Sequence, residues 1–151
     1  MGMYDIFVAA LRCATCGRTS PSDYTTNMQT KLRDAPDLSS FKVGDTLAIN
    51  HATMVDSGYY AVQPASEPVH IAQMWSCPYC HHYPNWAEIV VRDSRIERIE
   101  AVPLDLPTLD RVHYLDDDAL GSIEMLAGRN LRDQSKADAV ALLRSLLSGA
   151  T

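Results

Sequence analysis

The residues of this chain best suited to chemistry are its four cysteines, which form two equally spaced pairs. Cys13 and Cys16 enclose two residues, and Cys77 and Cys80 do the same. A two-residue gap lets both sulfurs of one tight turn face a single ion at about 2.3 Å, and two such turns make a closed tetrahedral S₄ site. Gly17 fits such a turn because glycine accepts a positive φ. The sequence therefore predicts that the four cysteines bind one metal ion together.

The stretch "WSCPYCHH" (75–82) also allows a second interpretation, a redox dithiol of the glutaredoxin type. Such a dithiol needs its first cysteine at a helix N-terminus, where the backbone amides lower the thiol pKa. The following segment, "HHYPNWAEIVV", argues against a helix, because Pro84 fits only a first turn and the run at 89–91 prefers a strand. The redox interpretation is therefore the weaker one, and four buried cysteines without a metal are a further alternative.

The elements that would position the two pairs are mostly strands. The hydrophobic pattern predicts strands at 3–12, 24–32, 58–63, 69–75, 85–91 and 95–102, and two short strands within 41–50 about Gly44 and Asp45. The last two long strands flank Asp93-Ser94 and form a hairpin. The composition changes at Pro103, where an acidic connection (103–115) begins. A C-terminal helical segment (116–151) follows, with helices at about 117–127, capped by Asp116 or Asp117 and stopped by Gly128, and at 136–147, capped by Ser135.

This order predicts an α+β fold, in which a mainly antiparallel β domain (1–102) precedes helices that pack on the same domain. Each cysteine pair follows a predicted strand. With Cys13, Cys16, Gly17, Cys77, Pro78 and Cys80 in these places, the β-rich part resembles the zinc-ribbon proteins with rubredoxin-like knuckles. The resemblance implies one structural Zn²⁺ held by the four cysteines, with iron as the less favoured metal.

Two features depart from the zinc-ribbon pattern. His81 stands where a rubredoxin-like second knuckle usually has glycine, and sixty residues separate Cys16 from Cys77, against about fifteen to twenty in common four-cysteine patterns. The long insert is permissible because the entropy of loop closure rises slowly with length. Both departures lower the expectation of iron and of electron transfer, and neither removes a tetrahedral site.

The overall charge and the N-terminal residues restrict the partners and the location. The net charge of −6 disfavours a partner held mainly through phosphates, although nucleic acid stays an alternative. The N-terminus lacks the basic segment and cleavage site of a signal peptide, and no apolar run reaches the length of a membrane span. We therefore expect a cytoplasmic protein with no membrane partner, where cysteines serve as metal ligands more often than as disulfides.

Other polar and aromatic residues near the motifs have two interpretations each. Arg12 and Arg18 flank the first knuckle and either offset the charge of the thiolates or stay in solvent. Trp75, Tyr79, Tyr83 and Trp86 form either a small core over the metal or a recognition surface. For the histidines, His81 and His82 included, hydrogen bonding or solvent exposure is favoured over metal ligation. The acidic run at 116–118 is expected to cap a helix.

A closed S₄ site has no open coordination position for Lewis-acid chemistry, and no nucleophile elbow or phosphate loop occurs in the sequence. The sequence therefore favours a non-enzymatic, zinc-binding accessory or adaptor protein that contacts another protein or a second copy of itself. The alternatives are a nucleic-acid-binding ribbon and, with less support, a cysteine-based redox protein.

Overall fold

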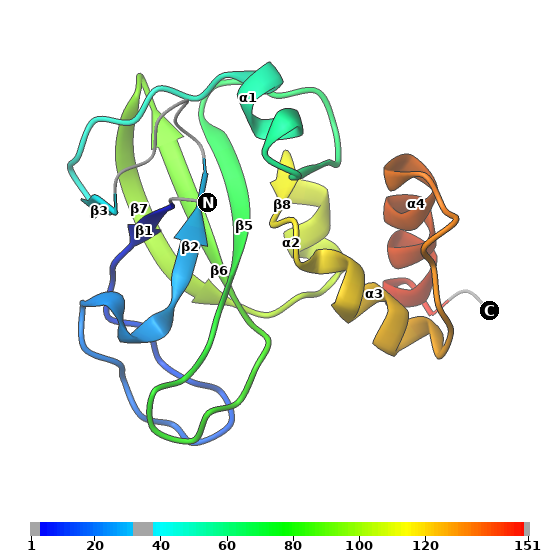
Figure 1. The fold of residues 1–151 in the computed structure, drawn as a ribbon, viewed down its shortest axis with the longest axis horizontal. Coiled ribbons are helices and arrows are strands. Elements are labelled where there is room, and N and C mark those ends of the chain that lie inside the picture. The colour runs from blue at the N-terminus through cyan, green and yellow to red at the C-terminus, as the bar shows by residue number, and fades with distance from the viewer. Residues whose placement is uncertain (1–3, 32–37, 150–151) are drawn as a thin grey trace.

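A computed structural model of the chain describes residues 4–31 and 38–149. In chain order the elements are β1 (Asp5–Phe7), a 3-10 turn η1 (Tyr24–Thr26), β2 (Met28–Thr30), β3 (Ser40–Phe41), α1 (His51–Asp56), β4 (Tyr60–Ala61), β5 (Val69–Trp75), β6 (Asn85–Arg92), β7 (Arg95–Val102), α2 (Leu106–Arg111), β8 (Tyr114–Leu115), α3 (Ala119–Ala127) and α4 (Lys136–Leu147). The predicted α+β class is confirmed, with mostly antiparallel strands in two sheets and helices at the C-terminal end (Figure 1).

The larger sheet has the order β4-β8-β5-β6-β7, and the predicted hairpin, β6 with β7, forms one side of it. β5 pairs antiparallel with β6 over its whole length, and β6 pairs antiparallel with β7. Asp93 and Ser94 have φ values of 51° and 60°, which is the backbone that a two-residue hairpin turn needs to match the strand twist. The turn thus fixes the pairing of β6 with β7, in which Arg92 faces Arg95.

The smaller sheet, β2-β1-β3, holds the first cysteine pair through the chain that leaves β1. The predicted strand at 3–12 is shorter than expected, because after Phe7 the chain leaves the sheet toward the first knuckle. The predicted strand at 24–32 opens instead with η1, capped by Asp23, and Asn27 in the left-handed region separates η1 from β2. Residues 3 and 32 of these predictions lie outside the described residues.

Three elements had no clear signal in the sequence. α1 begins at an Asn50 cap and α2 at an Asp105 cap with Pro107 in its first turn. β8 has only two residues and joins the large sheet parallel to β5. The acidic connection thus carries a helix and a strand. α3 starts at Ala119 after Asp118, two residues later than predicted, and ends at Gly128, whose φ is 70°. α4 has the predicted bounds, and the Ser135 hydroxyl accepts the Asp138 N–H.

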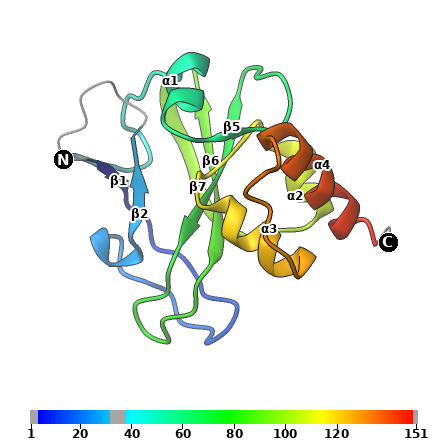
Figure 2. The same cartoon turned by 45° about the vertical axis from the view of Figure 1, so that its right-hand side comes forward.

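Two hydrophobic clusters pack on opposite faces of the large sheet. One includes Phe7, Met28, Ile71 and Trp75 and fills the space between the sheets. The other lies under α2, α3 and α4, which Figure 2 shows gathered at one side of the sheet. There α4 buries Val140 and Leu143 and packs against α3, β4 and α2. The leucine-rich stripe of α4 therefore completes a core.

Candidate metal centre

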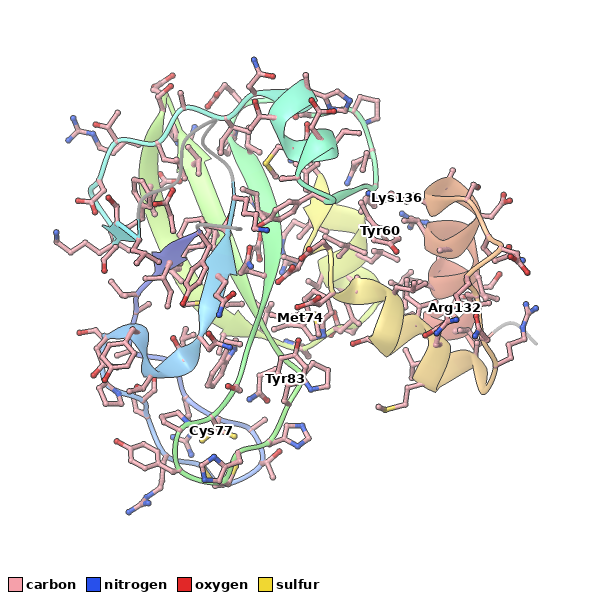
Figure 3. All side chains as sticks on the ribbon, in the orientation of Figure 1. Tyr60, Met74, Cys77, Tyr83, Arg132 and Lys136 are labelled. Carbon is pink, nitrogen blue, oxygen red and sulfur yellow. The ribbon has the colours of Figure 1, made fainter. Side chains whose placement is uncertain are left out.

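The two cysteine pairs lie in two loops at the same end of the molecule. The loop between β1 and η1 carries the first pair and the loop between β5 and β6 carries the second, and both views place these loops side by side (Figures 1 and 2). Figure 3 labels Cys77 at this end of the molecule. Segments that are far apart in the sequence thus meet at one point.

The distances among the four sulfurs are those of a tetrahedral site. All four Sγ atoms lie within 4.8 Å of one another. Cys13 Sγ is 3.7 Å from Cys80 Sγ, and Cys16 Sγ is 3.6 Å from Cys77 Sγ. A tetrahedral ion with bonds of about 2.3 Å to sulfur separates its ligands by about 3.8 Å. The four free thiols therefore form a tetrahedral-like cluster that could hold one metal ion.

Equivalent hydrogen bonds build the two knuckles. The N–H of Gly17 donates to Cys13 O at 2.8 Å, and the N–H of His81 donates to Cys77 O at 2.9 Å. The N–H of Cys13 donates to Arg18 O, and that of Cys77 donates to His82 O. Gly17 has the expected positive φ of 76°, and His81 adopts φ of 61° in the equivalent place. The pattern is compatible with a Cys-x-x-Cys knuckle pair, and the histidine does not disturb it.

The surroundings of the sulfurs shift the pKa values of Cys77 and Cys80 in opposite directions. Burial opposes the Cys77 thiolate, yet the N–H groups of Cys80 and Tyr79 and the neighbouring thiols lower its pKa to about 7. At Cys80 the His82 N–H favours the thiolate, but burial and the other sulfurs raise its pKa to about 11. Four thiolates this close repel one another, and a bound cation removes that repulsion.

The two arginines beside the first knuckle differ in their contacts. The Arg18 guanidinium lies over the Tyr79 ring, 4.5 Å from its centroid, so it joins the first knuckle to the second by a cation–π contact. Arg12 is exposed, and its guanidinium lies close to Gly17. A Cβ built at Gly17 would lie 3.8 Å from Arg12 Nη2.

The aromatic cluster near the second knuckle divides between the two interpretations. Trp75 and Trp86 are buried, and they belong to the clusters on opposite faces of the sheet. Tyr79 and Tyr83 keep 42% and 49% of their surface exposed. The tryptophans are therefore core residues, and the tyrosines form part of the surface next to the cysteines.

Three of the five histidines make hydrogen bonds away from the cysteines. His51 Nδ1 lies 2.7 Å from Tyr114 Oη, and His113 Nδ1 accepts the His70 N–H at 3.0 Å. His70 Nδ1 also bonds Glu88, whose carboxylate holds Arg111 through two nitrogens. His81 and His82 are exposed on the second knuckle. The buried Glu88 cluster was missed at the sequence level, where its sole signal is a carboxylate within an apolar strand.

The acidic run at 116–118 does not cap α3 as expected, because the N-cap is Asp118 and not Asp116 or Asp117. Asp118 precedes α3 but makes no side-chain capping bond. Asp116 is buried and accepts hydrogen bonds from Gln73 Nε2, from the Met74 N–H and from the Asp118 N–H. Burial raises its pKa to about 8. Its role is to fix the start of α3 on β5.

The geometry disfavours the redox interpretation of Cys77-Pro78-Tyr79-Cys80. The motif sits in a turn, and after a short extended stretch the chain enters β6 at Asn85. The helix that would stabilise an attacking thiolate is therefore not formed at this motif.

No protein-family model, curated protein or solved structure matches this chain. Over residues 4–31 and 38–149, none of the helices combines the length and apolar character needed to cross a bilayer.

Proposed function

We propose that Cys13, Cys16, Cys77 and Cys80 hold one structural Zn²⁺, and that the chain is a zinc-ribbon-type accessory protein acting through contacts with other proteins. The observation that carries the metal assignment is the convergence of four sulfurs within 4.8 Å from loops sixty residues apart. A closed S₄ set suits zinc, because structural zinc sites take four protein ligands and leave no coordination position open for a substrate.

The proposed zinc would join the N-terminal loop to the β5–β6 loop. Cys13 and Cys77 are buried in the hydrophobic cluster between the sheets, so a metal bound to them is continuous with that core. Structural zinc contributes about 10–16 kcal/mol in small peptides, which is as much as the total stability of a typical domain. In the reducing cytoplasm that we propose as its location, thiolates stay available to the metal.

Elemental analysis of the purified protein tests the metal. We expect about one zinc per chain, and we expect a thiol reagent to find four reactive cysteines only after chelation. A Cys16→Ser/Cys80→Ser variant is expected to lose the zinc. One iron per chain would correct the metal, and four reactive thiols in the protein as isolated would refute the site.

The contact surface of the proposed accessory role is the knuckle end. Tyr79 and Tyr83 are half exposed there, and Arg18 stacks on Tyr79. Exposed tyrosines with an arginine are typical of protein contacts. We expect Tyr79→Ala to abolish the capture of a partner or of a second copy while zinc content stays unchanged, with exposed Tyr24→Ala as the matched control. A strict monomer that captures nothing contradicts this role.

The stacked Arg18 and Tyr79 pair also supports a second candidate, binding of single-stranded nucleic acid. The net charge of −6 opposes it. Fluorescence anisotropy with a labelled oligonucleotide decides, because true binding is strong at low salt and falls steeply as salt rises. No binding at low salt excludes this function.

A further inference from the structure

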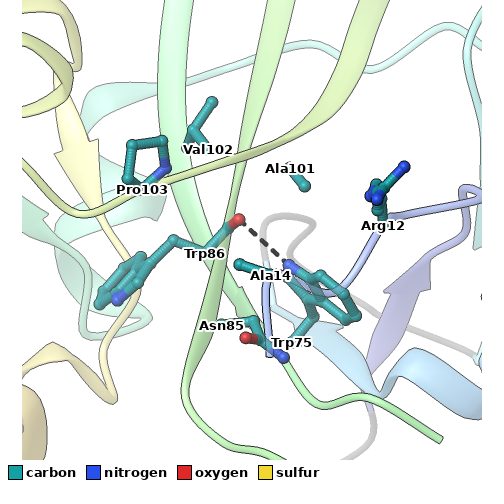
Figure 4. A pocket seen from close by; sticks show the side chains of 8 residues that line it. All are labelled: Arg12, Ala14, Trp75, Asn85, Trp86, Ala101, Val102 and Pro103. Carbon is teal, nitrogen blue, oxygen red and sulfur yellow. Dashed lines mark hydrogen bonds between the residues drawn. The ribbon is translucent and has the colours of Figure 1, made fainter. Parts of the chain in front are cut away.

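A cavity of about 340 Å³ lies between the first knuckle and the edge of the large sheet (Figure 4). Arg12 and Ala14, on either side of Cys13, form one wall. The end of β7 and the residue after it, Ala101 to Pro103, form the opposite wall. Small-molecule sites have about this volume and are lined mostly by apolar groups with a few polar ones. The cavity is separate from the cysteine sulfurs, although the same loop shapes both.

The apolar walls of this cavity come from small side chains at an open sheet edge. β7 is the outermost strand of its sheet, and Ala101 is exposed on it where a larger residue would fill the space. Pro103 ends the strand and offers no backbone N–H to a ligand. The Trp75 indole closes the inner side, and its Nε1–H is already committed to Trp86 O at 3.1 Å. This side of the cavity therefore suits an apolar group.

Two side chains give the cavity its polar character. Among the described residues, no hydrogen bond or ion pair engages the Arg12 guanidinium. Asn85 donates one Nδ2–H to His82 O at 3.1 Å, which leaves its second N–H and its Oδ1 for a ligand. A guanidinium presents paired N–H donors that match a planar carboxylate in two parallel bonds. A single cation on a chain of net charge −6 suits a monoanion better than a polyanion.

We infer that this cavity binds a small monocarboxylic acid with an apolar body. The carboxylate pairs with Arg12 and accepts the free Asn85 N–H, and the body lies against Ala101, Val102 and the edge of Trp75. The binding is non-covalent and stands on the cavity and its charge, independently of which metal the cysteines hold.

The two tryptophans of the chain give a direct reading of occupancy. Both tryptophans line the cavity, but the Trp86 indole points away from that of Trp75 (Figure 4) and packs in the cluster under the helices. In an NMR titration of the full-length protein as isolated, with 4-phenylbutyrate as the probe, the Trp75 indole N–H resonance should shift saturably and more than that of Trp86. We expect a dissociation constant of about 0.1–5 mM, as is usual for so small a ligand.

Matched probes and variants separate this site from non-specific binding. The neutral 4-phenylbutyramide and inorganic phosphate should each bind at least about tenfold more weakly, because one lacks the charge and the other the apolar body. Arg12→Gln should weaken 4-phenylbutyrate at least about tenfold, and Arg18→Gln, on the same knuckle, less than about twofold. Ala101→Leu fills the cavity from an exposed strand position and should weaken it at least about fivefold.

Metal content and thermal unfolding of each variant are measured beside the titration, so that a loss of binding is not confused with a loss of folding. Four results overturn the inference: no saturable shift of Trp75, equal binding of acid and amide, phosphate binding tighter than the acid, or unchanged binding in a folded Ala101→Leu variant.

Discussion

The second knuckle keeps a left-handed backbone at His81, where the first knuckle has Gly17. Both N–H groups close the same kind of turn onto the first cysteine of their pair. A residue with a Cβ is strained in this region by about 1 kcal/mol, whereas glycine is not. The two knuckles therefore share one geometry at different conformational cost.

We accordingly expect His81→Gly to stabilise the protein by about 0.5–1 kcal/mol and to raise its Tm by about 1–4 °C. The reverse change in the first knuckle, Gly17→Ala, should lower the Tm by a similar amount. Thermal unfolding followed by circular dichroism measures both. A lower Tm for His81→Gly would show that the imidazole makes a stabilising contact of its own.

Asp116 is the residue for which pH matters most clearly. Its pKa of about 8 in the folded chain lies above the value of about 3.9 in an unfolded one. Its contribution to stability is therefore full below pH 4 and is lost as the pH rises to 8. The exposed Asp133, in the loop between α3 and α4, serves as a control.

Urea unfolding at pH 5 and pH 8 tests this titration. We expect the wild-type chain to lose more stability between these values than Asp116→Asn does, by about 1–4 kcal/mol. Asp133→Asn should behave like the wild type. Equal pH dependence in Asp116→Asn and the wild type would show that Asp116 is ionised throughout.

At the scale of elements, one ion-pair cluster fastens α2 to the sheet. The Glu88 side chain on β6 is 3% exposed, and its Oε1 lies 2.7 Å from Arg111 Nη2 on α2. Arg98 Nη2 lies 3.9 Å from the same carboxylate, and His70 bonds it from β5. Arg111 and His70 offset the burial of Glu88 and lower its pKa. A carboxylate so enclosed depends on its partners.

Removal of the main partner should therefore be costly. We expect Arg111→Met to destabilise the protein by about 2–4 kcal/mol, because Glu88 stays buried, and Glu88→Gln/Arg111→Met to lose less than the sum of the single changes. Arg92→Met removes the exposed pair with Glu97 and should change stability by less than about 0.5 kcal/mol. Urea unfolding measures the stability change of Arg111→Met, of Glu88→Gln, of the double variant and of Arg92→Met. Strict additivity of the two single changes would argue against a coupled cluster.

Elements with local signals could be predicted from the sequence, and elements that depend on distant contacts could not. Asp93-Ser94 and the Ser135 cap lie within a few residues of what they determine, and the hairpin and α4 were predicted. β8 exists because Tyr114 and Leu115 meet Ile71 and Ala72, more than forty residues away. The cysteine cluster was predicted because the two-residue spacing within each pair is typical of metal ligands. The cavity was not predicted, because it forms where Ala14 and Ala101 come together and neither stretch of sequence carries a motif for it.

At the scale of the whole molecule, the large sheet separates two cores, and the cysteines belong to one of them. Cys13 and Cys77 pack with Phe7, Met28 and Trp75, and α2, α3 and α4 cover the opposite face. Loss of structure at the knuckles should therefore destabilise the core between the two sheets before it affects the core under the helices.

Hydrogen exchange after chelation tests this division. We expect the amides of the two knuckle loops and of β1 to lose protection by at least about tenfold, and those of α4 to change by less than about threefold. Uniform loss along the chain would mean that the two cores unfold as one unit, and unchanged knuckle amides would contradict a structural metal.

The distance along the chain between the paired sulfurs also affects synthesis. Cys16 and Cys77 are 61 positions apart, yet their sulfurs meet. Ribosomes add about 5–20 residues per second, so the first pair waits about 3–12 s for the second. During that interval the thiols of Cys13 and Cys16 are unprotected in the nascent chain, and oxidants and other metal ions can reach them. The N-terminal loop can therefore take its final position only late in translation, after the second pair has left the exit tunnel.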